Sequence, residues 1–121
     1  MEEALLNDGR AQIPDIYFSS GSDRIREESE VRLQEIANML KRHPDWKLNG
    51  EGHTDSFAEE DFNLRLSQRR AAAVKSALVT RYGIDASRLT PQGFGETRPR
   101  ASNKTPVGRA HNRRVELVRL P

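Results

Sequence analysis

A long amphipathic segment in the middle of the chain constrains the fold more than any other feature. Residues 63–82 carry apolar side chains on one helical stripe, at Leu66, Val74, Ala77 and Leu78. Gly83 follows directly, at a position where a left-handed residue ends many helices. The spacing predicts a helix over residues 63–82, and its apolar face has to be buried against other elements of the same domain.

Shorter patterns surround this helix. Apolar residues recur at helical spacing over residues 26–42, and His43-Pro44 ends that run. Strand patterns occupy three further segments, residues 46–53, 90–94 and 115–120. Gly50 and Gly52 in the first of them indicate close backbone packing. Two short helical turns are also predicted, at residues 85–89 and from Thr105-Pro106, where a threonine cap precedes a proline.

The N-terminal residues show a different pattern. Asn7-Asp8-Gly9 is a turn sequence of the hairpin kind, and β-prone residues follow it over 10–18, with Pro14 at an edge or a bulge. We therefore predict an N-terminal extension over residues 1–15 that forms a hairpin, and one domain over residues 16–121. The order of elements, a hairpin followed by α, β, α, β and β, specifies an α+β two-layer sandwich with helices on one face of a mixed sheet.

The predicted core lies between the helices and the sheet. It draws apolar side chains from each of the longer elements: Tyr17, Phe18, Ile36, Leu40, Leu48, Leu66, Val74, Leu78, Leu89, Val115 and Leu117. The chain has 121 residues, of which 35% are hydrophobic and 31% are charged. This length and composition suit one domain with a modest core.

Composition excludes several classes of protein. The chain has no cysteine, which excludes a disulfide framework and thiol chemistry. It contains no apolar run near the roughly 18 residues that a membrane span requires. Its first residues also lack the pattern of a signal peptide. We therefore expect a soluble chain, and the absence of cysteine suits the cytoplasm and the periplasm equally.

Charge is divided unevenly along the chain. Residues 1–61 contain 7 Lys/Arg and 15 Asp/Glu, for a net charge of −8, whereas residues 62–121 contain 13 and 3, for a net charge of +10. Arginine supplies 16 of the 20 basic residues, and its planar guanidinium favours bidentate contacts with carboxylate or phosphate. An anionic partner is one interpretation, and pairing of the two halves across the fold is the other.

Catalytic and metal chemistry have little support in the sequence. His53 and Asp55 lie two residues apart near the end of a strand, without the serine elbow typical of a catalytic triad. The histidines and acidic residues lack the i, i+4 spacing of a helical zinc site, and thiol ligands are absent. We therefore expect neither a catalytic site nor a metal.

One face of the central helix carries a candidate binding residue. Asn63, Ser67, Arg70 and Val74 share that face, and Arg70 is expected to point inward. Leaving a buried guanidinium without an anion would cost on the order of 3–5 kcal/mol, so a carboxylate has to meet it. Asp55 could provide it in a plain ion pair between strand and helix, or a ligand could provide it. Spacing alone leaves both alternatives open.

Motifs spaced along most of the chain resemble one family. They are Gly52-His53-Thr54-Asp55, Phe62-Asn63, Leu66-Ser67, Arg70-Ala71, Gly83-Ile84, Arg88-Leu89, Gly93-Phe94-Gly95-Glu96, Gly108-Arg109 and Asn112-Arg113-Arg114-Val115-Glu116-Leu117. In this order they resemble the OmpA-like peptidoglycan-binding domain of OmpA-type porins, peptidoglycan-associated lipoproteins and the flagellar stator protein MotB. The resemblance covers about residues 16–118. It implies a βαβαββ fold, a periplasmic location and noncovalent binding of the cell wall, without enzyme activity or a cofactor.

The resemblance also implies roles for individual residues. The family's ligand is the diaminopimelate of the peptidoglycan stem peptide, whose side chain ends in an ammonium and a carboxylate on one carbon. By resemblance, Asp55 binds the ammonium and Arg70 binds the carboxylate. Thr54, Asn63 and the backbone that follows Asp55, beginning at Ser56, would fix the remaining polar atoms.

The rim of the implied site involves two further segments. Arg113 or Arg114 would line it, and because neighbouring residues of a strand alternate, one of the two points toward the site and the other away. Many family members alternate Phe and Asp near their first strand. This chain has Phe18-Ser19-Ser20-Gly21-Ser22 instead, which lacks acidic side chains near the pocket.

Two other functions stay open at this point. One is a protein-interaction module whose ligand site has decayed. The other is nucleic-acid binding by the arginine-rich half, against which stand the 6% aromatic content and the lack of a helix-turn-helix, zinc or aromatic-platform pattern. We expect peptidoglycan as the partner. Membrane contact would come only through other parts of an outer-membrane-associated or wall-anchored parent protein, and dimerisation is left open.

Overall fold

The computed structural model describes all 121 residues and contains four α-helices and four strands. Along the chain they are α1 (Glu2–Asn7), β1 (Arg10–Ile13), α2 (Glu30–Arg42), β2 (Leu48–His53), α3 (Glu60–Tyr82), β3 (Leu89–Gly95), α4 (Pro106–Asn112) and β4 (Arg114–Arg119). Single 3-10 turns at Glu27–Ser29 and Ala86–Arg88 precede α2 and β3. The strands form one sheet in the order β1-β4-β2-β3. Because β2 and β3 are parallel and the other pairs are antiparallel, the predicted α+β class and mixed sheet are confirmed.

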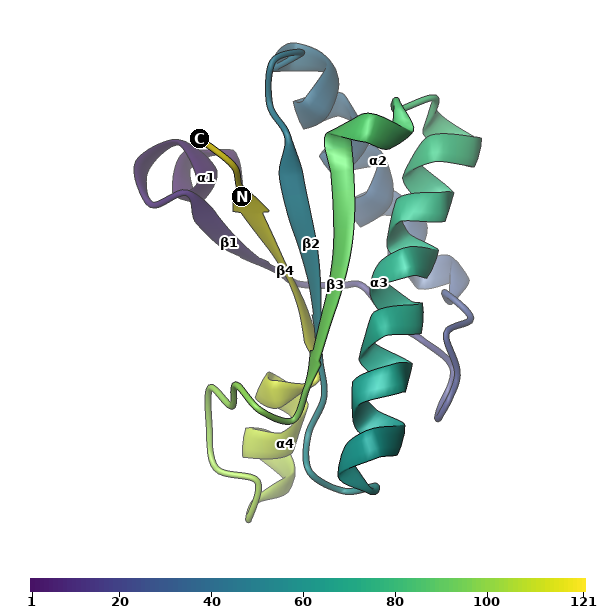
Figure 1. Ribbon diagram of the computed structural model, residues 1–121, viewed down its shortest axis with the longest axis vertical. Helices are drawn as coiled ribbons and strands as arrows, with labels where there is room; N and C mark the ends of the chain where they lie inside the picture. The colour runs from purple at the N-terminus through teal and green to yellow at the C-terminus, as the bar shows by residue number, and fades with distance from the viewer.

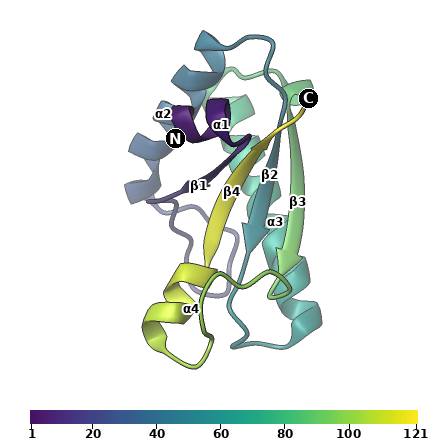
Figure 2. The same ribbon diagram turned by 90° about the vertical axis from the view of Figure 1, so that its left-hand side faces the viewer.

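The two long helices lie on the same face of this sheet (Figure 1). Figure 2 shows the opposite face, with α1 beside the β1 edge and α4 beyond the lower ends of the strands. We call this second face, which α2 and α3 leave uncovered, the open face. None of the helices is both long enough and apolar enough to cross a membrane.

Helix α3 matches the predicted central helix. It begins at Glu60, three residues before the expected start, and ends at Tyr82. Glu60 and Asp61 occupy its first turn, where the helix dipole favours acidic side chains, and the apolar stripe begins only after them. Gly83 follows in the left-handed conformation, with φ of 71°. The other predicted helices and strands, apart from the N-terminal ones, differ from the observed ones by at most four residues at an end.

Two glycines let α3 lie directly on β2 and β3. A Cβ atom at Gly52 would lie 2.4 Å from the carbonyl oxygen of Ser67, and one at Gly93 would lie 2.3 Å from the backbone nitrogen of Gln68. Both distances are far below van der Waals contact, so a side chain at either position would push the helix away. Close backbone packing, predicted for this strand, is confirmed at Gly52. Gly50, in contrast, has no atom nearer than 4.0 Å to such a Cβ.

One hydrophobic core fills the space between the helices and the sheet. It contains eight of the predicted core residues: Ile36, Leu40, Leu48, Val74, Leu78, Leu89, Val115 and Leu117. Phe18 is partly buried against this core, and Leu66 is buried outside it. The prediction is wrong for Tyr17, which is 46% exposed. Its hydroxyl group donates to the carboxylate of Asp15 at the surface, at 2.9 Å.

The N-terminal hairpin is also a wrong prediction. Residues 2–7 form α1, and β1 pairs with β4 at the other end of the chain. Gly9, with φ of 70°, makes the expected turn, but this turn joins a helix to a strand. Leu5 is fully buried in the core, which stabilises this short helix. The division of the chain at residue 15 stays a prediction, although β1 belongs to the same sheet as the other strands.

Candidate functional site

Asp55 lies just beyond the end of β2, where the chain turns toward α3. The backbone N–H of Thr54 donates to the carbonyl oxygen of Gly95 at 2.9 Å, which keeps the chain attached to β3 for one residue after the strand. The Thr54 hydroxyl group donates to the carbonyl oxygen of Asp55, also at 2.9 Å. Thr54 and Asp55 are both buried. The backbone of Asp55 is therefore fixed by the edge of the sheet.

The carboxylate of Asp55 makes two contacts. Its Oδ1 accepts the backbone N–H of Phe57 at 3.0 Å, an interaction that shapes the loop after β2. Its Oδ2 accepts an N–H of Arg113 at 2.6 Å, in an ion pair that links the loop after β2 to the residue between α4 and β4. The Arg113 side chain is half exposed, whereas that of Asp55 is only 11% exposed. Arg113 therefore lies on the solvent side of this pair.

Asn63, in the first turns of α3, binds this loop to the helix. Its buried amide nitrogen donates to the carbonyl oxygens of Asp55 and Ala58, at 3.2 and 3.0 Å. It also lies 3.3 Å from a carboxylate oxygen of Glu96. Because the amide N–H groups of Asn63 are engaged by the protein itself, its contribution to the site is to position Asp55.

Arg70 reaches the site from the middle of α3. Its Nε donates to the carbonyl oxygen of Ser22 at 2.8 Å, and one terminal N–H group donates to that of Ser19 at 3.3 Å. Its guanidinium also lies over the ring of Phe18, with 4.8 Å between the guanidinium carbon and the ring centroid. Burial and the nearby Arg113 cation lower the pKa of Arg70, whereas Asp23 and Asp55 act in the opposite direction.

The structure bears on one of the two roles that the sequence left open for Arg70, an ion pair with Asp55. Asp55 pairs with Arg113 and not with Arg70, so the plain ion pair between strand and helix is wrong. Arg70 is held by neutral carbonyl oxygens, which fix its orientation without neutralising its charge. Asp55 thus pairs with Arg113 and also acts on the Arg70 guanidinium, near which Asp23 lies as well.

The remaining candidate residues differ in position. Ser56 is exposed on the loop after Asp55, and its side chain makes no hydrogen bond. Arg114 points away from Asp55 and donates through Nε to the carboxylate of Glu116. Arg113, which ends α4, and Arg114, the first residue of β4, therefore pair with different carboxylates.

Sequence reasoning placed residues 18–22 near the pocket but did not predict that they hold Arg70. Ser19 and Ser22 contribute backbone carbonyl oxygens, which any residue type would provide, so no side-chain pattern marks them. The contact between the Phe18 ring and the Arg70 guanidinium was not predicted either. Glu96 belongs to the motif Gly93-Phe94-Gly95-Glu96, but its contact with Asn63 could not be predicted. That contact forms because the end of β3 meets the start of α3.

The arrangement suits recognition of a small charged group. It offers one oriented carboxylate, two arginines with different degrees of exposure, and an exposed aromatic ring at Phe57, which is 89% accessible. No three His, Asp or Glu side chains of the chain come together in a way that could hold a metal ion.

Comparison with known proteins identifies the family of this fold and site. Porin F of Pseudomonas aeruginosa is 41% identical over 102 residues, which are 84% of this chain but only 29% of the porin. The peptidoglycan-associated lipoprotein of Burkholderia pseudomallei matches in structure with a TM-score of 0.78 and 31% identity, over 87% of this chain and 88% of that one. The cell wall anchor of the T6SS of Pseudomonas aeruginosa matches with a TM-score of 0.77 and 31% identity, over 98% and 93%. The model of the OmpA family matches residues 17–113, so the chain belongs to the OmpA family.

Proposed function

We propose that this chain binds peptidoglycan noncovalently and anchors an envelope protein to the cell wall by recognising the diaminopimelate of the stem peptide. The observation that carries this proposal is the pairing at the end of β2. The Asp55 carboxylate is fixed by the loop backbone and faces Arg113, while Arg70 is held by carbonyl oxygens and keeps its charge.

The chemistry of the ligand fits this pairing. The side chain of diaminopimelate ends in an ammonium and a carboxylate on one carbon, so it needs an anion and a cation close together. Asp55 would bind the ammonium, and Arg70 would bind the carboxylate through the guanidinium N–H groups that the Ser19 and Ser22 carbonyls leave free. Arg113, already paired with Asp55, would line the rim. Thr54 and Asn63 would hold the loop in place, and Ser56 would supply a backbone N–H group.

The relatives support the same role. Two solved relatives are a peptidoglycan-associated lipoprotein and a cell wall anchor. Porin F and the outer-membrane lipoprotein YfiB, both of Pseudomonas aeruginosa, are outer-membrane proteins by name. The chain would therefore act in the periplasm, as the wall-binding part of an outer-membrane or envelope-anchored protein.

Sedimentation with insoluble peptidoglycan tests wall binding. Wild type should sediment with the wall, whereas Asp55→Ala and Arg70→Ala should stay in the supernatant while keeping a native circular dichroism spectrum. Arg65→Ala is a matched control, because Arg65 is an exposed residue of α3 that makes no ion pair. Failure of the wild type to sediment would refute the proposal and favour an interaction module whose ligand site has decayed.

Competition tests the assignment of charges within the site. Free meso-diaminopimelate should release the protein from the wall, whereas lysine, which has the ammonium but lacks the carboxylate beside it, should compete poorly. Loss of one hydrogen bond to a charged group costs about 1.5–3 kcal/mol, which corresponds to roughly a tenfold to hundredfold difference in affinity. Equal competition by the two amino acids would refute the roles given to Asp55 and Arg70, even if the wall is still bound.

A further inference from the structure

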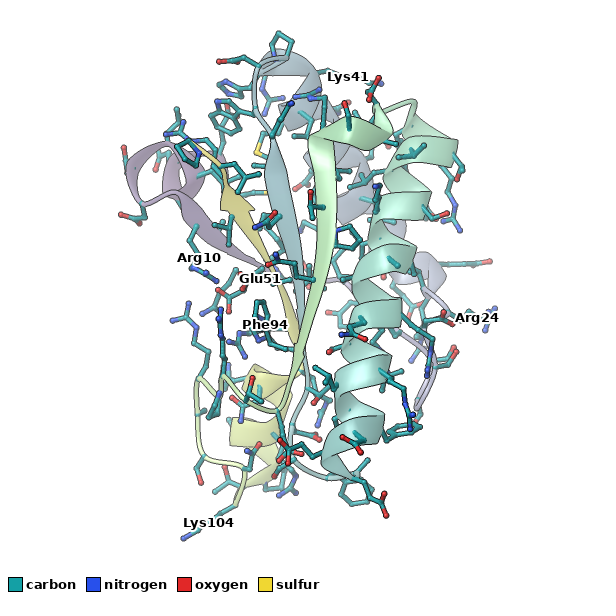
Figure 3. The ribbon with its side chains drawn as sticks, viewed as in Figure 1. Arg10, Arg24, Lys41, Glu51, Phe94 and Lys104 are labelled. Carbon is teal, nitrogen blue, oxygen red and sulfur yellow. The ribbon has the colours of Figure 1, made fainter.

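A second group of charged side chains lies on the open face of the sheet. Figure 3 shows Arg10, Glu51 and Phe94 on the side of the sheet away from α3. The strand register places Glu51 of β2 directly opposite Glu116 of β4. In the same register, His53 lies opposite Arg114. These residues come from alternate positions of all four strands, and so they share one face.

Two buried carboxylates lie at the centre of this group. Glu51 and Glu116 are 3% and 1% exposed, and two like charges opposite each other on a sheet repel. Arg10 offsets this repulsion by donating to both, with distances of 2.7 Å to Glu51 and 2.9 Å to Glu116. Arg114 and Arg100 donate to Glu116 as well. Burial disfavours ionisation of both carboxyl groups, but the hydrogen bonds from these arginines outweigh it, and the pKa of Glu116 falls to about 2.

The guanidinium groups on the open face outnumber the two carboxylates. Arg98 makes no hydrogen bond through its guanidinium, and its nearest carboxylate oxygen, on Glu51, is 3.9 Å away. It lies instead over the ring of Phe94, with 3.7 Å between the guanidinium carbon and the ring centroid. The side chains of Arg98 and Arg100 are about half exposed. Four guanidinium groups against two carboxylates leave a net charge of +2 on this face.

These residues line an open, shallow cavity, and one of them has a buried polar atom without a partner. The cavity has a volume of about 260 Å³ and is lined by the four arginines together with His53, Pro99 and Glu116. His53 is 3% exposed, and its Nδ1 has no hydrogen-bond partner. Its Nε2 faces a carboxylate oxygen of Glu51 at 3.1 Å and therefore carries the proton, which leaves Nδ1 as an acceptor. A buried polar atom without a partner is rare in folded proteins.

We propose that the open face carries a second binding site, formed by Arg10, Arg98, Arg100, Arg114 and His53, whose ligand is a phosphate group. A phosphate monoester carries about −1.5 to −2 charges at neutral pH, which matches the excess of +2, whereas a single carboxylate would leave half of it uncompensated. Its oxygens accept from the free N–H groups of Arg98 and Arg100. The site is separate from that of Asp55, because Asp55 pairs with Arg113 and none of the arginines of the open face pairs with it.

Nuclear magnetic resonance titration tests this site on the intact chain. Inorganic phosphate should shift the amide resonances of His53, Arg98 and Arg114 in a saturable manner, at constant ionic strength, and acetate should not. Arg98→Gln should weaken phosphate binding at least about tenfold, because it removes a charged donor. Arg65→Gln removes the same charge from the exposed surface of α3 and should bind phosphate as wild type does.

The variants are chosen so that a negative result is decisive. Arg98 makes no hydrogen bond through its side chain, so Arg98→Gln should fold normally, and its spectrum away from the open face should match that of wild type. Shifts that grow linearly with phosphate, or that are equal in wild type and Arg98→Gln, would overturn the proposal.

A second arm separates two sources of the phosphate group. Vesicles of phosphatidylcholine mixed in equal parts with phosphatidic acid carry a phosphate monoester at their surface, and vesicles of phosphatidylcholine alone do not. The ligand would be a lipid headgroup if wild type floats only with the mixed vesicles and Arg98→Gln does not float with them. Saturable binding of inorganic phosphate without flotation would support a soluble phosphate group.

Discussion

Replacement of Gly52 by alanine is the sharpest test of how the sheet positions α3. A Cβ atom at this position would lie 2.4 Å from the carbonyl oxygen of Ser67, 3.1 Å from its carbonyl carbon and 3.4 Å from its Cα. All three atoms belong to the backbone of α3, so rotation of a side chain cannot relieve the overlap. The helix and the strand would have to separate by about 1 Å to restore ordinary contact, which begins near 3.4 Å.

The loss of unfolding free energy in Gly52→Ala can be compared with that of a control variant on the same strand, Gly50→Ala. Forcing extra atoms into a packed interior typically costs about 1–3 kcal/mol of unfolding free energy. Gly50→Ala introduces the same methyl group where the nearest atom is 4.0 Å away. A substitution of that kind tends to stabilise by about 0.4–1 kcal/mol, because alanine restricts the unfolded chain. The two variants should therefore differ by about 1.5–4 kcal/mol.

Equilibrium unfolding in urea, followed by circular dichroism, measures this difference. The Gly52→Ala variant should also bind the wall more weakly, because a displaced α3 carries Asn63 away from the carbonyl oxygen of Asp55 that it now contacts at 3.2 Å. Gly50→Ala should bind as wild type does. Equal stabilities of the two variants would show that α3 does not depend on close approach at Gly52, and the account of its position would be refuted.

Three further outcomes are expected. Leu78→Ala removes a fully buried side chain from the core and should lower the unfolding free energy by about 2–5 kcal/mol in the same urea assay; a loss below about 1 kcal/mol would contradict the placement of this residue. Glu116 has a folded-state pKa of about 2 against an ordinary value of 4.5, so its contribution is complete above pH 4.5 and is lost as the pH falls from there toward 2. That contribution amounts to about 3 kcal/mol, and Glu116→Gln should flatten this part of the stability curve. Thr105 caps α4 by accepting the backbone N–H of Gly108 at 3.0 Å, so Thr105→Ala should cost about 1 kcal/mol in thermal unfolding, and an unchanged melting temperature would argue against the cap.

Much of the fold could be predicted because the relevant signals are local in the chain. The stripe of apolar residues in α3 and the left-handed Gly83 after it lie within one segment, and both appear in the structure. The N-terminal segment failed for the opposite reason. Its six helical residues are too few to show a period, and the burial of Leu5 that stabilises them depends on elements distant in sequence.

The candidate site, too, could be predicted only in part from the sequence. Sequence motifs singled out Asp55, Arg70 and Asn63, and the structure brings Asp55 and Asn63 into contact through the loop after β2. It could not be predicted that Arg113 would pair with Asp55, nor that the carbonyl oxygens of Ser22 and Ser19 would hold Arg70.

Outside the N-terminal segment, the sequence by itself determined which segments become helices and strands, and it determined which side chains carry charge. Only the tertiary structure decided how those charges are shared: Asp55 with Arg113 beyond the end of β2, and Glu51 and Glu116 with a surplus of arginines on the open face. The physical reason is that helix and strand patterns arise from neighbours in the chain. Ion pairs depend instead on strand register and on backbone contacts between residues far apart in it.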